Sequence, residues 1–319
     1  MNNSFEEIIE HFDAAKRIAI FCHARPDGDA LGAGLALCLA FESAGKQAYM
    51  CCEDVPPEKF SFIPSMKKVL QEIPEVDYDL FVSVDCADSA RVGVFSKRYN
   101  KFKKTTVNID HHVSNNRYAK LNYVVECPAS CEIITELLTK AGYEITQEIA
   151  NLLMIGLVTD TGNFTHQDVT QKTFKTAALL RSKGADVNLI YYNLYARQTK
   201  ERALLYGRVM NNIRFALDDK LAYIIISKKD MTELNADKSL TEGFVDFPLS
   251  IDGVEVSAAF LENNKGQYKV SLRSKGKVNV NAVATAFGGG GHVLASGCML
   301  FGELEEVIER LSYAVYQNL

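Results

Sequence analysis

Short hydrophobic runs alternate with longer amphipathic stretches through the first half of the chain. The runs at Arg17–Cys22, Asp79–Asp85 and Thr105–Asp110 are typical of buried parallel strands. Leucines recur every fourth residue within about 29–44, and Gly45 follows, which predicts a helix that ends at this glycine. The alternation continues with a strand at 47–52 and helices at about 130–142, 147–158 and 170–184. This order predicts an α/β domain with a doubly wound, mostly parallel sheet.

The pattern changes in the second half of the chain. A continuous helical pattern over about 186–213 predicts a connector, and later apolar runs separated by turn residues predict a smaller α/β domain. The expected elements there are strands at 221–227, 254–261 and 268–273 and helices at about 279–287 and 303–317. A chain of 319 residues exceeds the size at which single cores stop growing, about 250–300 residues. We therefore expect domains at 1–187 and 213–319, joined by a helical connector at 188–212.

Composition and charge exclude several classes of protein. Hydrophobic residues make up 47% and charged residues 24%, as in ordinary globular proteins. The net charge of −5 argues against a protein that coats long nucleic acid, because such proteins carry a basic excess. No apolar stretch approaches the length of about 18 residues that a membrane span needs, and the N-terminus does not resemble a signal peptide. The eight cysteines form no C-x-x-C pair, which favours reduced, buried thiols in a cytoplasmic protein.

Acidic and histidine residues recur where the predicted strands and one helix end. The first group is the loop His23-Ala24-Arg25-Pro26-Asp27-Gly28-Asp29, and the others are Asp85, Asp110-His111-His112 and Asp160. Open α/β sheets bind their ligands at the carboxyl ends of their strands. Carboxylates and imidazoles without thiolates favour Mn²⁺ or Mg²⁺ over structural zinc. The pattern predicts a binuclear site, in which two ions about 3.5–4 Å apart activate water for in-line displacement at phosphorus.

A run of four glycines followed by a histidine is the main chemical feature of the second half. Gly288, Gly289, Gly290 and Gly291 precede His292, and Ser296 follows. Because such a run costs backbone entropy, we expect it to serve an anion-binding nest of N–H groups rather than packing. A flexible hinge is the alternative. Arg273 ends a predicted strand and suits a bidentate phosphate clamp, the alternative being a solvated surface arginine.

These motifs resemble those of the DHH phosphoesterase superfamily. The resemblance rests on H-A-R-P-D-G-D at 23–29, Asp85, D-H-H at 110–112 and T-D-T-G at 159–162. The glycine run with Ala295-Ser296-Gly297 resembles the motif of the DHH-associated C-terminal domain. The likeness covers nearly the whole chain. A two-domain chain of this length is most similar to the bifunctional nanoRNases, which degrade very short RNA and remove the 3′-phosphate from 3′-phosphoadenosine 5′-phosphate (pAp).

The resemblance implies a role for each candidate residue. One metal ion would be held by His23, Asp27 and Asp85. The other would be held by Asp29, Asp85, His111 and Asp160, so that Asp85 bridges the two ions. The catalytic pair would be Asp85 and His112, with His112 facing the scissile phosphate. Substrate would be bound by Arg273, Ser274, Gly288, Gly289, Gly290, Gly291, His292 and Ser296.

The expected function is therefore that of a cytoplasmic phosphoric ester hydrolase with its cleft between two domains. It would cut very short RNA to mononucleotides and pAp to AMP through attack of a water that bridges two Mn²⁺ ions, with Mg²⁺ as the alternative metal. Short oligonucleotides and nucleotides are the expected partners, whereas long duplexes and membranes are not. A homodimer is left open.

Other functions are weighed against this expectation. A phosphodiesterase acting on cyclic or linear dinucleotides, of the c-di-AMP or pApA type, would share the same chemistry. An inorganic pyrophosphatase would carry a basic phosphate motif in place of Gly288–His292. A processive single-strand exonuclease would be larger and more basic. A nonenzymatic nucleotide-binding or RNA-binding module would not need the complete set of metal ligands.

Overall fold

The chain folds into two compact units, Met1–Arg197 and Gln198–Leu319, in the computed structural model, which describes residues 2–319. The boundary falls inside the predicted connector, and the expectation of a continuous helix there is wrong. Helix α7 (Val187–Tyr191) continues as a wider turn over Tyr192–Ala196, after which residues 197–199 are extended. Helix α8 (Lys200–Met210) starts afresh because the Thr199 hydroxyl accepts a hydrogen bond from the Arg202 N–H.

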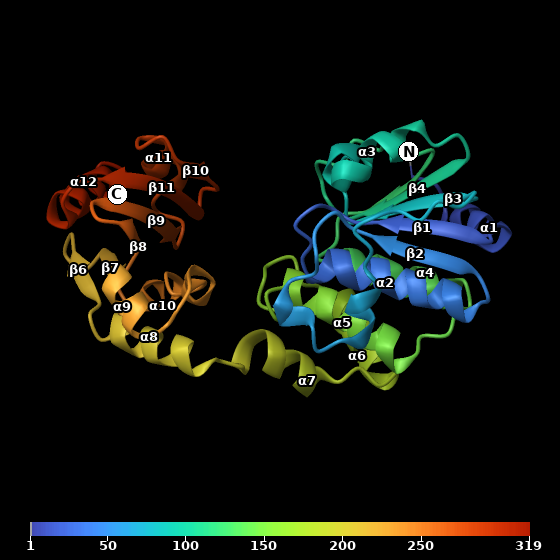
Figure 1. Ribbon diagram of the computed structural model, residues 1–319, viewed down its shortest axis with the longest axis horizontal. Coiled ribbons are helices and arrows are strands. Elements are labelled where there is room, and N and C mark those ends of the chain that lie inside the picture. The colour runs from blue at the N-terminus through green and yellow to red at the C-terminus, as the bar shows by residue number, and fades with distance from the viewer. Residues whose placement is uncertain (1) are drawn as a thin grey trace. The chain divides into compact units, whose positions relative to one another are not determined.

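The first unit is built on a parallel sheet, as the sequence predicts (Figure 1). Within residues 2–319 this sheet has five strands in the order β2-β1-β3-β4-β5. Their bounds are β1 Arg17–Phe21, β2 Gln47–Cys51, β3 Leu80–Val84, β4 Thr105–Asp110 and β5 Leu121–Val124. The strand order reverses between β1 and β3, and open α/β sheets form their binding crevice at such a point. Strand β5 and its place at the sheet edge were not expected from the sequence.

Helices cover both faces of this sheet, which makes it doubly wound. One face is covered by α2 (Gly28–Ser43) and α4 (Ser130–Lys140), and α5 (Gln147–Asp160) packs against both of them. Helices α1 (Phe5–Ala14) and α6 (Gln171–Ser182) complete this side. On the other face, Phe21 and Phe81 of the sheet pack with Tyr99 of α3 (Ser96–Lys101). Figure 1 shows α3 across the sheet from α2 and α5.

Helices α2 and α5 approach each other closely at Gly156. A Cβ atom at this position would lie 2.3 Å from Cys131 Sγ and 2.6 Å from Asp29 Oδ1. Glycine therefore lets α5 approach the first turn of α2, where Asp29 lies fully buried. The packing of these helices thus fixes the position of one candidate metal ligand.

The second unit contains a mixed sheet. Among the described residues it has six strands in the order β10-β11-β9-β8-β7-β6, of which only β7 and β8 pair in parallel. Their bounds are β6 Arg214–Ala216, β7 Leu221–Ile226, β8 Val256–Asn264, β9 Gln267–Ser274, β10 Gly290–Gly291 and β11 Ala295–Phe301. Helices α11 (Val280–Thr285) and α12 (Leu304–Tyr316) cover one face. Helices α8, α9 (Lys228–Glu233) and α10 (Asp246–Leu249) lie over β7 and β8 on the other.

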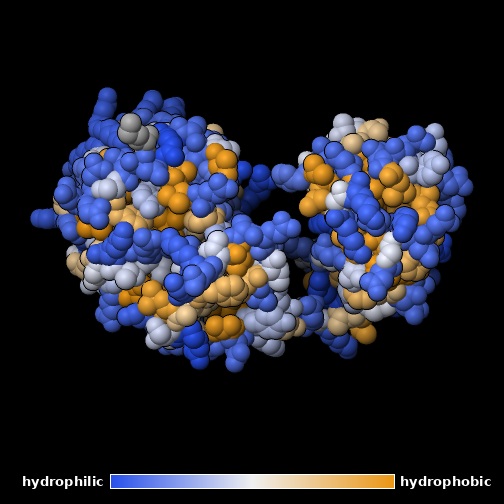
Figure 2. Space-filling model, turned by 180° about the vertical axis from the view of Figure 1, so that it is seen from behind, coloured by the Kyte–Doolittle hydropathy of each residue, from blue (hydrophilic) through white to orange (hydrophobic). Residues whose placement is uncertain are grey.

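On the face shown in Figure 2, hydrophilic residues make up most of the surface, and hydrophobic residues form smaller groups between them. None of the helices within residues 2–319 combines the length and the hydrophobicity needed to cross a membrane.

Candidate metal centre

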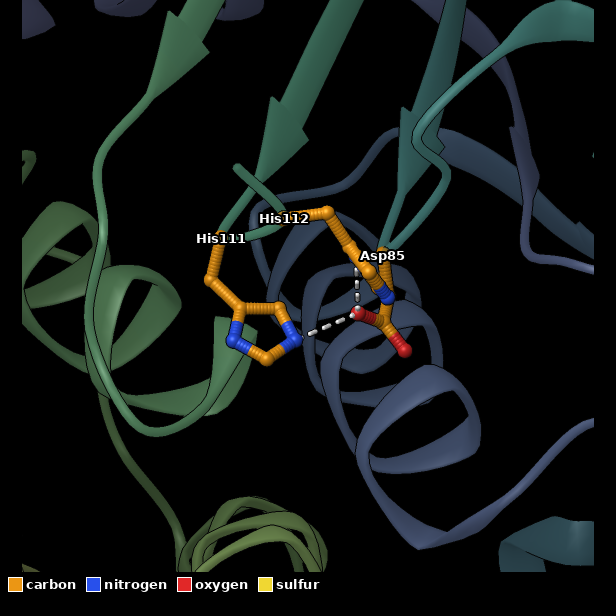
Figure 3. A group of neighbouring side chains, drawn as sticks. All are labelled: Asp85, His111 and His112. Carbon is orange, nitrogen blue, oxygen red and sulfur yellow. Dashed lines mark ion pairs between the residues drawn. The ribbon is translucent and has the colours of Figure 1, made fainter. Parts of the chain in front are cut away.

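Asp85 occupies the middle of the candidate site. It follows β3 in a left-handed backbone conformation (φ 55°), and its N–H donates to Ile109 O of β4 at 3.0 Å. Its side chain is almost completely buried, and its two oxygens face different histidines. Oδ2 lies 3.4 Å from His23 Nε2, and Oδ1 lies 3.3 Å from His111 Nε2. In Figure 3, dashed lines join one oxygen of Asp85 to both His111 and His112, the two histidines that follow β4. The carboxylate of Asp85 therefore lies close to candidate metal ligands on two different segments, His23 after β1 and His111 after β4.

The carboxylate of Asp29 is held by the start of a different helix. Helix α4 has no side-chain cap of its own at Ala129, and its first backbone N–H groups donate instead to Asp29, from Ser130 at 2.6 Å and from Cys131 at 2.9 Å. In the loop before α2, Asp27 accepts from the N–H groups of Asp29 and Ala30 and so caps that helix. Backbone N–H groups at the N-termini of α4 and α2 therefore hold the carboxylates of Asp29 and Asp27 in place.

Backbone contacts orient the rings of His23 and His111, which are mostly buried. His23 Nδ1 lies 2.8 Å from Ala24 O, and His111 Nδ1 lies 2.8 Å from Cys127 O. A carbonyl oxygen can only accept, so Nδ1 carries the hydrogen and Nε2 is the atom left to bind a metal. Metal-binding histidines in proteins commonly show this arrangement.

The six predicted metal ligands converge in space. Among the described residues, three groups have ligand atoms within 4.8 Å of one another: His23, Asp27 and Asp85; Asp29, His111 and Asp160; and Asp85, His111 and His112. Asp85 belongs to the first and third of these groups, and His111 belongs to the second and third. Asp160 joins them from the C-terminal end of α5, with Oδ2 at 3.5 Å from His111 Nε2.

The pKa values of the group reflect the crowding of carboxylates and imidazoles in a mostly buried site. Burial, together with the neighbouring aspartates, raises the pKa of Asp160 to about 9, and burial and Asp85 raise that of Asp29 to about 7. Burial would lower the pKa of His23, but hydrogen bonds with Asp27 and Asp85 raise it to about 11. Burial would also lower the pKa of His111, but the hydrogen bond with Asp85 and the charges of Asp29 and Asp85 raise it to about 10. Protons are retained where cations would otherwise balance the carboxylates, so the oxygen and nitrogen donors fit hard divalent ions.

His112 is set apart from the other two histidines. Its side chain is 30% exposed, against 13% for His23 and 15% for His111. Its Nδ1 lies 2.8 Å from Asp110 Oδ1 and 3.6 Å from Asp85 Oδ1. Nδ1 is therefore engaged with a buried carboxylate, which leaves Nε2 for a ligand in the more open part of the site.

Two arginines that the motifs left without a role lie beside this centre. A cavity of about 590 Å³ is lined by His23, Arg25, Asp88 and Arg91. The backbone carbonyl of Arg91 accepts a hydrogen bond from the Ala24 N–H at 2.8 Å. This bond connects the segment around Arg91 to the loop after β1. Arg25 stands inside the 23–29 motif, but the only sequence signal for Arg91 is its place six residues after Asp85.

The glycine run in the second unit differs from the expected nest. A Cβ at Gly289 would lie 2.2 Å from Gly297 O, and one at Gly291 would lie 2.6 Å from Ala295 O. The expectation that packing does not account for the run is therefore wrong for Gly289 and Gly291, which allow this segment to approach β11, whereas a Cβ at Gly288 or Gly290 would meet no atom closer than 3.9 Å. Several backbone donors of the run are also used inside the unit, including Gly289 N to Ala284 O (2.9 Å) and His292 N to Ala295 O (2.7 Å). His292 itself is exposed.

The predicted substrate-binding side chains divide between the two faces of the second sheet. Ser274 Oγ accepts from Gly276 N at 3.0 Å, and Ser296 Oγ donates to Val280 O at 2.5 Å, both as buried residues of the face that α11 covers. Arg273 points to the opposite face, where its Nε donates to Asp246 Oδ1 at 3.0 Å. The substrate contacts of the two serines stay a prediction, whereas their hydroxyls have partners within the fold.

Comparisons with known proteins cover nearly the whole chain. Residues 17–157 match the DHH family, N-terminal domain, and residues 218–317 match the DHHA1 domain. The bifunctional oligoribonuclease and PAP phosphatase NrnA of Thermus thermophilus is 31% identical over 95% of this chain and 90% of its own length. The chain belongs to the DHH family. Members of this family are metal-dependent phosphoesterases, so the protein is a phosphoric ester hydrolase, as expected.

Two further relatives of this DHH protein are informative. An exopolyphosphatase-related protein from Bacteroides fragilis has a solved structure with a TM-score of 0.85 and 28% identity, covering 98% of this chain and 95% of that one. The cyclic-di-AMP phosphodiesterase GdpP of Bacillus subtilis is 26% identical over 99% of this chain, which spans 49% of its length. The first likeness confirms the expected fold of both units.

Proposed function

We propose that this DHH enzyme hydrolyses very short RNA oligonucleotides to mononucleotides and pAp to AMP. The observation that carries the proposal is the position of Asp85, whose two oxygens face His23 on one side and His111 on the other. The likeness to an oligoribonuclease and PAP phosphatase along nearly the whole chain supports this choice of substrates.

Six side chains would hold the metal ions in this proposal. His23, Asp27 and Asp85, whose ligand atoms lie within 4.8 Å of one another, would hold one ion, and Asp29, His111 and Asp160, which form a second such group, would hold the other together with Asp85. Manganese is proposed, with magnesium as the alternative. When bound, such a pair supplies a nucleophilic water at neutral pH and Lewis-acid stabilisation of the phosphoryl oxygens.

The remaining residues bind and orient the substrate. His112 presents Nε2 to a phosphoryl oxygen, because its Nδ1 is occupied by Asp110. Arg25 and Arg91 line the cavity beside His23 and pair with substrate phosphate there. Arg273 and His292 of the second unit bind the rest of the nucleotide. Residues 1–187 thus carry the chemistry and 213–319 the additional binding groups, with the connector 188–212 between them, in a cytoplasmic enzyme.

The experiment measures hydrolysis of 5′-labelled RNA dimers to pentamers and of pAp with Mn²⁺ or Mg²⁺. Wild type is expected to cut both substrate classes, and Asp85→Asn to lose at least about a hundredfold in rate, more than a change behind the metal ligands would cause. Asp252→Asn is the matched control, since Asp252 is exposed in the second unit. Unchanged RNA and pAp, with wild type and Asp85→Asn equally inert, would refute the proposal.

The likeness to a cyclic-di-AMP phosphodiesterase over 99% of this chain favours one second candidate, hydrolysis of cyclic or linear dinucleotides. The same metal centre would serve that reaction. Rates on c-di-AMP, pApA, RNA dimers and pAp, compared at equal enzyme concentration, separate the candidates. A preference for cyclic dinucleotides of more than about tenfold would replace the first proposal.

A further inference from the structure

Strand β9 presents alternate side chains to opposite faces of the second sheet. Tyr268, Val270 and Leu272 are buried in the core beneath α11 and α12. Lys269, Ser271 and Arg273 occur between them and therefore face the other way, as the period of two in a β-strand requires. On that face, α8, α9 and α10 pack over β7 and β8.

This second face holds a cavity of about 300 Å³. Ala259 and Leu261 of β8 line it with apolar side chains, and the segment 238–245 lines it with Lys238 and neighbouring residues. Lys269, Ser271 and Arg273 all line it as well. The cavity lies entirely within the second unit.

The lining of the cavity is positively charged. Lys238, Lys269 and Arg273 contribute three cations, and Glu242 is the one carboxylate among its lining residues. Within the described chain, neither lysine has a carboxylate partner within 4.0 Å, whereas Arg273 is oriented by its hydrogen bond to Asp246. In a chain of net charge −5, two lysines without a carboxylate partner beside an arginine favour an anionic ligand.

The spacing of the polar residues suggests which kind of anion fits. Alternate residues of a strand lie about 7 Å apart along its axis. Lys269, Ser271 and Arg273 therefore form a row of three side chains that carry hydrogen-bond donors, at a spacing comparable to that of successive phosphates in an extended single strand. A single phosphate would engage only one of them.

We propose that Lys269 and Ser271, with Lys238 on the facing wall, form a binding track for additional phosphodiester groups of a short RNA, continuing from Arg273. This inference rests on the proposed function for the class of substrate. It assigns binding roles to Lys238, Lys269 and Ser271, which belong to none of the sequence motifs. It also makes β9 a determinant of preference for oligonucleotides over a mononucleotide such as pAp.

The test compares binding of a 5′-fluorescein RNA trimer and of pAp by the full-length chain in EDTA, where metal-dependent hydrolysis is prevented. Anisotropy gives the affinity for the trimer, and competition against the trimer gives that for pAp. Lys269→Ala and Lys238→Ala are each expected to reduce the ratio of trimer affinity to pAp affinity by roughly fivefold, as loss of one favourable ion pair at a solvent-exposed position does. Each should also lower the slope of log affinity against log salt by about 0.7.

Lys265→Ala is the matched control. Lys265 is an exposed lysine in the turn between β8 and β9, outside the cavity, and its removal causes the same change in charge. It is expected to leave the affinity ratio unchanged. Melting temperatures of the variants check that they fold. The binding track is refuted if both cavity variants show the same ratio of trimer affinity to pAp affinity as Lys265→Ala. It is also refuted if the wild type binds no trimer.

Steady-state kinetics with Mn²⁺ separate failure of this inference from failure of the proposed function. If wild type binds the trimer through Lys269 but cuts neither RNA nor pAp, the proposed function fails and the binding track stands. If wild type cuts RNA and the KM for the trimer is the same in Lys269→Ala and Lys265→Ala, the track fails and the proposed function stands.

Discussion

His112 Nδ1 lies 2.8 Å from Oδ1 of Asp110, a carboxylate with no exposed surface. The other oxygen of Asp110 accepts from Asn115 Nδ2 at 2.6 Å, and Asn115 also donates to Asn108 Oδ1 and Cys86 O. A chain of hydrogen bonds thus runs from buried polar groups to one imidazole ring. It fixes the ring with Nε2 directed away from Asp110.

Asp110→Asn is expected to lower kcat by about 10- to 100-fold with a smaller change in KM. The substitution keeps the size of the side chain but removes the charge that stabilises and orients the His112 ring. The Mn²⁺ content, measured by elemental analysis, should stay at the wild-type value, because Asp110 belongs to none of the three candidate ligand groups.

Asn115→Ala should act in the same direction and more weakly, since it removes one donor to Asp110. A double-mutant cycle separates positioning from general destabilisation. In a His112→Ala background, neither change should reduce kcat further if both act through this ring. Full additivity with His112→Ala would contradict the positioning role.

Gly156→Ala is expected to destabilise the first unit by about 1–3 kcal/mol and to weaken Mn²⁺ binding. The new methyl group would meet Cys131 Sγ and the carboxylate of Asp29, neither of which lies at the end of a long, flexible side chain. Urea unfolding and Mn²⁺ titration measure the two effects. The control is Gly207→Ala on α8, where a Cβ meets nothing within 4 Å and the change should be neutral or stabilising. Equal stability of the two variants would contradict the close approach of α2 and α5.

The strand-end residues of the site could be predicted from sequence because their positions depend on a simple rule. Asp85 and His111 follow apolar runs that become β3 and β4, and neighbouring parallel strands end at one sheet edge. His23 follows β1 in the same way. The reversal of strand order between β1 and β3 then brings these residues to one crevice. The parallel sheet and the clustering of the candidate metal ligands follow from this local pattern.

Other features depend on contacts between distant segments and leave no local signal. Asp29 caps α4, which starts about a hundred residues later, and the sequence around Ala129 shows only that a side-chain cap is missing. Gly289 has no room for a side chain because the backbone of β11 lies too close. A motif that indicates anion binding therefore serves packing as well. The break after Ala196 was missed because a helical pattern continues on both sides of it.

Two adjacent glycines in the second unit should respond differently to alanine. Gly289→Ala places a Cβ 2.2 Å from Gly297 O, and we expect a loss of about 1–3 kcal/mol in the stability of this unit. Gly290→Ala, where the nearest atom is 3.9 Å away, is the control and should cost less than about 1 kcal/mol. Thermal unfolding of the full chain measures both. Equal losses at the two positions would argue against packing of β10 on β11 as the reason for Gly289.

The free energy of unfolding of the first unit should depend on pH because of Asp79. Its carboxylate accepts from the N–H groups of Arg17 and Lys16, at 3.0 and 3.1 Å, where β1 begins. Burial alone would raise the pKa of Asp79, but these hydrogen bonds and the nearby Lys104 lower it below the usual 3.8. The unfolded chain therefore binds the proton more tightly than the folded chain, and the stabilisation by Asp79 is lost as pH falls through the folded pKa.

Asp79→Asn is accordingly expected to cost about 1 kcal/mol near pH 7, where the ionised carboxylate makes these contacts. The difference from wild type should shrink as the pH falls below about 4, because the wild-type side chain then becomes neutral as well. Urea unfolding at a series of pH values measures it, with the exposed Asp252→Asn as the matched charge change. A cost that stays constant from pH 7 to the acid limit of folding would mean that Asp79 acts through its shape rather than its charge.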